Sequence, residues 1–70
     1  MTNIIAVYKG ETMFVVTDIL SGVTSQGNSF EEAKSNLKEA LELYYEDIPV
    51  NEWPKADVLI ATLEVTPNVI

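Results

Sequence analysis

The 70-residue sequence contains no cysteine and no histidine. Disulfide bonds and cysteine–histidine zinc sites are therefore excluded as stabilisers of this short chain. The most common general base and the thiol nucleophile are missing as well. With only three glycines, the chain shows no phosphate-binding loop, dinucleotide fingerprint or nucleophile elbow. We therefore expect a protein that is not an enzyme and that holds no metal and no cofactor.

Positive charge is scarce too. Four lysines and no arginine stand against eleven aspartates and glutamates, so the net charge is −7. Such a chain repels nucleic-acid phosphates and attracts a basic protein. The longest apolar run covers only five residues, 4–8. We therefore expect no direct nucleic-acid contact, no membrane span, no signal peptide and a cytoplasmic location.

Hydrophobic residues make up 47% of the chain, which is typical of a folded protein. The length allows one domain, residues 1–70. A domain this small gains little net stability from its own core. Because disulfides and zinc are excluded, a second protein chain is the remaining source of stability.

The first third of the sequence predicts three strands. Residues 3–9 and 12–18 are apolar on both faces and read as a hairpin, with a type II′ turn at Gly10-Glu11. Residues 23–26 alternate apolar and polar side chains as a short third strand.

A helix and a fourth strand follow. Ser29 and Glu32 have capping-box spacing and begin an amphipathic helix over residues 30–48, which Pro49 ends. Residues 56–66 alternate again and predict a strand. The expected fold class is α+β, in the order β-β-β-α-β, with a mostly antiparallel sheet and one helix packed on one face.

One helix covers only one face of a four-stranded sheet, yet several strands are apolar on both faces. We expect Ile5, Val7 and Ile60 on the uncovered face, where they form a larger apolar patch than most monomers expose. The sequence therefore predicts a homo-oligomer, a dimer or a tetramer, of which a two-fold dimer is the simplest.

Residues 18–47 read DILSGVTSQGNSFEEAKSNLKEALELYYED. They contain a turn, a short strand ending in Gln-Gly, a capped helix start and a late-helix Glu-Ala-Leu-Glu-Leu-Tyr. In these motifs the stretch resembles the HicB-like antitoxin family. The matching positions are Asp18, Gly22, Gln26, Gly27, Ser29, Glu31, Glu32, Ala33 and residues 39–44. The turn departs from the family pattern, since Thr17 replaces a proline and residues 19–21 are one residue longer.

The resemblance implies the partial RNase H-like arrangement of the family's N-terminal domain. It also implies that the chain binds and occludes a small basic HicA-type RNA-cleaving toxin. Family members usually add a C-terminal DNA-binding domain, which we do not expect because the sequence ends just after the predicted fourth strand. The alternative is an orphan homo-oligomeric structural or adaptor protein without a toxin partner.

The candidate partner-binding residues are Asp18, Glu31, Leu43 and Tyr45. The first two have structural alternatives, because Asp18 can accept N–H groups of the following turn and Glu31 complements the helix dipole. Leu43 lies well off the apolar helix stripe, Tyr45 lies at its edge, and Tyr44 lies on the stripe and is expected to face the core.

Other functional interpretations are weaker than their structural alternatives. Asp18 together with Glu31, Glu32 or Asp57 would imitate a nuclease cluster, but the spacing does not bring three carboxylates together. Gly27 is expected to need a positive φ, and Trp53 is expected to anchor the loop after the helix.

Overall fold

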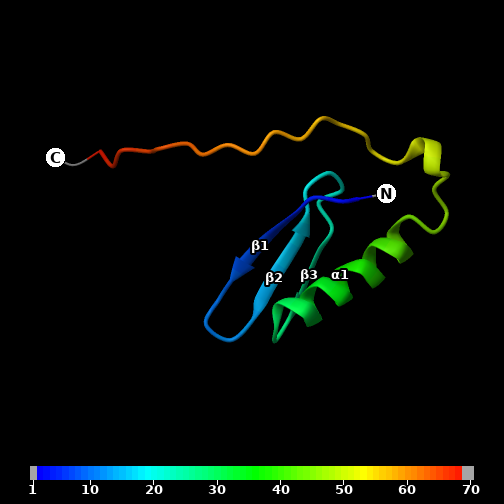
Figure 1. Cartoon of the computed structure of the whole chain (residues 1–70), viewed down its shortest axis with the longest axis horizontal. Coiled ribbons are helices and arrows are strands. Elements are labelled where there is room, and N and C mark those ends of the chain that lie inside the picture. Colours follow the sequence, from blue (N-terminus) through cyan, green and yellow to red (C-terminus); the bar gives the residue numbers. More distant parts are fainter. Residues whose placement is uncertain (1, 69–70) are drawn as a thin grey trace.

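The computed structural model describes residues 2–68, which form a three-stranded sheet, one helix and a long extended segment (Figure 1). The sheet order is β1-β2-β3, and both strand pairs are antiparallel. This arrangement confirms the predicted α+β class with three strands followed by a helix. The elements are β1 (Ile5–Lys9), β2 (Phe14–Asp18), β3 (Thr24–Gly27), α1 (Phe30–Tyr44) and the short 3-10 helix η1 (Val50–Glu52).

The turn between β1 and β2 differs from the predicted type II′ turn. Gly10 donates its N–H to the Met13 carbonyl over 2.8 Å, which places Glu11 and Thr12 at the centre of the turn. Gly10 also lacks the positive φ that a type II′ turn requires at its first central position. The returning strand therefore begins at Phe14, two residues later than predicted.

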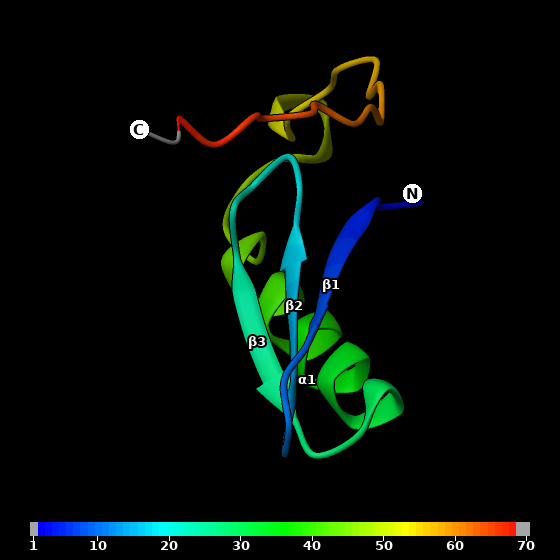
Figure 2. The same ribbon diagram turned by 90° about the vertical axis from the view of Figure 1, so that its left-hand side faces the viewer.

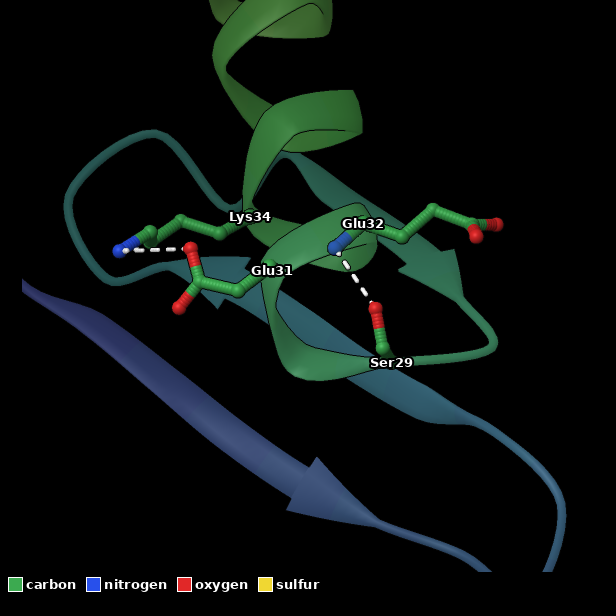
Figure 3. Close-up of polar contacts among 4 residues, drawn as sticks. All are labelled: Ser29, Glu31, Glu32 and Lys34. Carbon is green, nitrogen blue, oxygen red and sulfur yellow. Dashed lines mark hydrogen bonds and ion pairs between the residues drawn. The ribbon is translucent and has the colours of Figure 1, made fainter.

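The predicted cap begins α1. The Ser29 hydroxyl accepts a hydrogen bond from the Glu32 N–H over 3.1 Å (Figure 3). The Glu32 carboxylate accepts from the N–H of Asn28 over 3.4 Å, instead of from Ser29 as the capping box predicts. The Glu32 N–H, an orphan donor at the helix start, and the N–H of the residue before the cap thus both find acceptors.

The helix ends at Tyr44, four residues before the predicted end at Ile48. Tyr45 leaves the helical region at φ −93° and ψ 1°, and the chain then makes a tight turn in which the Ile48 N–H donates to the Tyr45 carbonyl. The apolar spacing continues past the helix because Tyr45 packs against the loop. Trp53 stacks on Tyr45 with ring centroids 4.5 Å apart and donates its indole N–H to the Ile48 carbonyl, which confirms its predicted anchoring role.

The core lies between α1 and only part of the sheet. Val16, Ala33 and Leu37 are buried at its centre. The helix packs on one face of the sheet, against β3 and β2, and makes no comparable contact with β1 (Figure 2). The partly buried side chains around this centre are Ile5, Phe14, Val23, Phe30 and Leu41.

Gly27 sets how closely β3 and α1 approach each other. A Cβ on Gly27 would lie 2.5 Å from the Ala33 backbone nitrogen and 2.9 Å from its Cα. The prediction that Gly27 needs a positive φ is wrong; in the described chain only Gly22 has one, at 78°. The requirement at Gly27 is absence of a side chain, and backbone conformation plays no part.

The structure corrects the face on which two predicted oligomer residues lie. Val7 stands opposite the buried Val16, and residues opposite each other in a sheet share a face. Ile5 lies two residues away on that same face and packs against the core. Both therefore lie on the helix side. The prediction placed them on the other face because β1 is apolar on both faces, and its pattern alone did not fix its orientation. Their role in an oligomer stays a prediction.

The fourth strand predicted over residues 56–66 is not formed. In the part of the chain that the structure describes, residues 54–68 carry no strand, and the segment leads away from the sheet (Figure 1). Alternation makes a segment suitable for pairing, but a strand also needs a neighbour for its backbone groups. Among the residues that the structure describes, this segment, including Ile60, has no such neighbour.

We predict that Gly27→Ala destabilises the protein by about 2–3 kcal/mol, because its methyl group forces the backbones of β3 and α1 apart. Urea unfolding followed by circular dichroism measures the loss. Gly10→Ala is the matched control, since its Cβ meets only the Met13 carbonyl oxygen at 3.3 Å. Equal stability of the two variants would contradict the close-approach argument.

Candidate partner-binding surfaces

Asp18 is fully buried at the end of β2, and its carboxylate holds two segments together. Oδ2 accepts from the Ser21 N–H over 2.9 Å and from the Ser21 hydroxyl over 2.6 Å. Oδ1 accepts from the Asn3 side-chain amide over 3.0 Å. Of the two predicted interpretations, this geometry is the turn-capping one, and it leaves no exposed carboxylate surface in the single chain.

The environment of Asp18 also sets its ionisation. Burial by itself raises the pKa of a carboxyl group, but the hydrogen bonds from Ser21 and Asn3 stabilise the charged form and outweigh burial. The pKa of Asp18 is therefore lowered from its ordinary value of 3.8. Asp18 is thus an ionised structural group at neutral pH.

Tyr45, the second predicted contact residue, is also buried. Its ring packs between Trp53 on one side and the edge of Tyr44, whose centroid is 4.9 Å away. Tyr44, which the helical stripe placed toward the core, is half exposed instead. The helix ends between the two tyrosines, so the rotation of about 100° per residue that predicted their directions no longer applies to Tyr45.

The other two predicted residues, Glu31 and Leu43, are exposed on α1. Leu43 is 67% exposed, although its side chain is large and apolar. At about 100° per residue, Glu32 and Glu39 lie within about 40° of Leu43 around the helix axis. We call this exposed surface the acidic helix face; its members are Glu32, Glu39 and Leu43, with Glu31 at its border, about 120° from Leu43 around the helix axis.

Glu39 was not among the residues predicted for this surface from the sequence. The signal was present, since Glu32, Glu39 and Leu43 follow one another at i, i+7 and i+11, opposite the buried stripe. Among residues 2–68, Glu31 and Lys34 form the one ion pair, with 3.7 Å between the carboxylate and the ammonium of exposed side chains (Figure 3). Glu39 thus presents uncompensated charge to solvent.

A second surface lies beside β1, where the helix leaves the sheet uncovered. It is an open groove of about 580 Å³ between β1, α1 and the Trp53 loop. Its floor and walls are largely apolar, and charged side chains of both signs stand at its rim. We call it the β1 groove; it is lined by Asn3, Ile5, Lys34, Leu37, Lys38, Leu41, Glu42, Tyr45, Glu46 and Trp53.

The described residues contain no group of three or more aspartate or glutamate side chains placed to hold a metal ion. Asp18 is buried on the strand side, whereas Glu31 and Glu32 are exposed in the first turn of α1. Over the same residues, α1 is too short and too polar to cross a membrane.

We predict that Asp18→Ala destabilises the chain by about 3 kcal/mol at pH 7, because the buried donors of Ser21 and Asn3 lose their acceptor. The isosteric Asp18→Asn costs less, about 1 kcal/mol, since an amide oxygen still accepts from Ser21.

The pH dependence follows from the lowered pKa. Ionised Asp18 stabilises the fold above the unfolded pKa near 3.8, and this contribution is lost as the pH falls through the lower folded pKa. The stability difference between the native chain and Asp18→Asn is therefore constant above about pH 5 and shrinks toward pH 3. Urea unfolding at each pH measures it, and a difference that grows on acidification would refute the assignment.

Comparison with known proteins places the chain in a family. A model of a family of unknown function, DUF7387, matches residues 1–69. A UPF0150 protein of Helicobacter pylori is 42% identical over 55 residues, which cover 74% of this chain and 76% of that protein. A UPF0150 protein of Synechocystis is 41% identical over 49 residues, 67% of this chain, and the match spans 62% of that relative's length. No solved structure matches the chain. The chain belongs to the DUF7387 family of unknown function and is a relative of the small UPF0150 proteins.

Proposed function

We propose that this protein is a binding module that captures and covers a small basic RNA-cleaving toxin of the HicA type, without chemistry of its own. The observation that carries the proposal is the acidic helix face, where the exposed Leu43 lies beside Glu32 and Glu39. The HicB-like motifs of residues 18–47 and the net charge of −7 support it.

The mechanism is steering followed by occlusion. An RNA-cleaving protein binds its substrate through a basic surface, because the RNA backbone is a row of negative charges. The glutamates of α1 offer a competing row of carboxylates, which accelerates encounter with such a surface. Leu43 supplies an apolar anchor beside these carboxylates, and burying it in the interface excludes water. The bound toxin is inactive because its RNA-binding surface is covered.

We predict that Glu31→Lys combined with Glu39→Lys weakens binding of a catalytically inactive HicA-type toxin at least tenfold, mainly through slower association. Surface plasmon resonance at two salt concentrations measures both rates, and the salt dependence of association decreases in the variant.

The matched control is Glu11→Lys combined with Glu52→Lys, which changes the net charge equally at exposed positions away from α1. The control retains near-native affinity. Equal weakening in both double variants would show that only net charge matters, and the absence of binding to HicA-type toxins by the native chain would overturn the proposal.

The alternative function is an orphan homo-oligomeric structural or adaptor protein. The uncovered β1 groove favours it, because the groove is apolar and lies apart from the outward face of α1. The two functions differ in the surface they use, and Leu43→Asp separates them: it removes toxin binding and leaves self-association unchanged.

A further inference from the structure

β1 is an edge strand whose outward backbone groups have no partner in the described chain. Ile19 donates to the Ile4 carbonyl over 3.0 Å, so Ile4 and Ile19 form a hydrogen-bonded pair. In an antiparallel ladder such pairs alternate with pairs that are not bonded to each other. The N–H and C=O groups of Ile5, Val7 and Lys9 therefore point away from β2, toward the free edge.

The β1 groove adjoins this edge. Ile5 lines the groove, and Val7, on the same face of the sheet, keeps 48% of its surface exposed. A strand added beside β1 would pair with the outward backbone groups and lay its side chains over this apolar surface. Edge and groove together form the site of one missing strand.

Residues 58–65 have the properties of that strand. Their backbone is extended, and Leu59 and Leu63 on one face are 90% and 88% exposed. The segment passes the start of β1, where residues 54–58 share a cavity with Thr2, Ile4 and Leu20. It then continues away from its own sheet, as Figure 1 shows.

We call residues 58–65 the arm, and the overall dimensions agree with an arm that leads away from its own domain. The radius of gyration is 15.2 Å, and the longest extent is 53 Å. A compact domain of this length has a radius of gyration of about 11 Å. When two copies of a chain exchange an identical element, each copy extends an apolar arm and offers a groove that the other copy's arm fills. This chain has both an exposed apolar arm and an unfilled groove.

Charge selects the occupant of the groove. Lys34 and Lys38 line it together with Glu42 and Glu46, so the groove is balanced although the chain as a whole is strongly acidic. Residues 58–65 carry a single charge, that of Glu64. An acidic copy of this chain can therefore dock its apolar arm here, whereas a basic protein gains more at the acidic helix face.

We propose that residues 58–65 of a second copy add as a strand to the free edge of β1 and fill the β1 groove, so that two copies exchange arms reciprocally. Leu59 and Leu63 belong to one face of the arm. The same contact forms twice around a two-fold axis and closes the assembly as a dimer. This inference does not rest on the toxin-binding function, because it uses a different surface.

Sedimentation equilibrium of the full chain is expected to give twice the monomer mass at micromolar concentration. Leu59→Asp combined with Leu63→Asp yields a monomer that keeps the helical circular dichroism signal, since neither side chain contacts the core. Leu43→Asp is the matched control and stays dimeric. A monomeric native chain, or a dimer unaffected by the double substitution, overturns the proposal.

Cross-linking distinguishes exchange from an arm that folds back on its own sheet. Because the chain has no cysteine, Val7→Cys and Ala61→Cys each create a single thiol. The two variants, one of them isotope-labelled, are unfolded together, refolded and treated with a short bis-maleimide. Arm exchange gives mainly the mixed 7–61 product, several-fold above either homodimer. A third variant carries both Val7→Cys and Ala61→Cys in one chain. If the two single-cysteine variants give no mixed product and the third variant is cross-linked only within one chain, the arm pairs in its own subunit and the exchange is ruled out.

Discussion

The contact between Gly27 and Ala33 determines where the helix lies on the sheet. With no Cβ at Gly27, the end of β3 reaches the first turn of α1, and the helix is held over β3 and β2. From there α1 buries Val16 and Leu37, and it reaches the side chain of Ile5 without approaching the backbone of β1 closely. The uncovered edge, the apolar groove and the outward direction of the acidic helix face all follow from that position.

The sequence predicted local structure well and long-range placement less well. The first three strands, the Ser29 cap and the Trp53 anchor depend on side-chain periodicity and short-range hydrogen bonds, which a sequence carries directly. The sides of the sheet on which Ile5 and Val7 lie depend on register with β2, and strands that are apolar on both faces leave the register ambiguous. The requirement at Gly27 depends on a contact with a following element and has no local signal.

The candidate site shows the same division. The burial of Asp18 among donors from Asn3 and Ser21 was one of two interpretations that the sequence left open. Tyr45 was misplaced because the helix ends one residue before it, and a rotation of about 100° per residue no longer describes its direction. Leu43 remained where helical geometry put it, since it lies inside α1.

The molecule thus separates two kinds of surface. The acidic helix face carries Glu32 and Glu39 beside the exposed Leu43, which suits a basic protein that arrives by electrostatic attraction. The side next to β1 is apolar and balanced in charge, which suits a strand of the same chain. A small core that leaves most of β1 uncovered has a physical reason to use the second surface, because a further strand completes it.

Amide hydrogen exchange at β1 tests this account most directly. The N–H groups of Ala6 and Tyr8 point to β2 and serve as the internal reference, whereas those of Val7 and Lys9 point to the free edge. If a second copy completes the sheet, the Val7 and Lys9 amides are protected at high protein concentration and lose that protection on dilution, while Ala6 and Tyr8 do not change. Fast exchange of Val7 and Lys9 at every concentration would contradict the account.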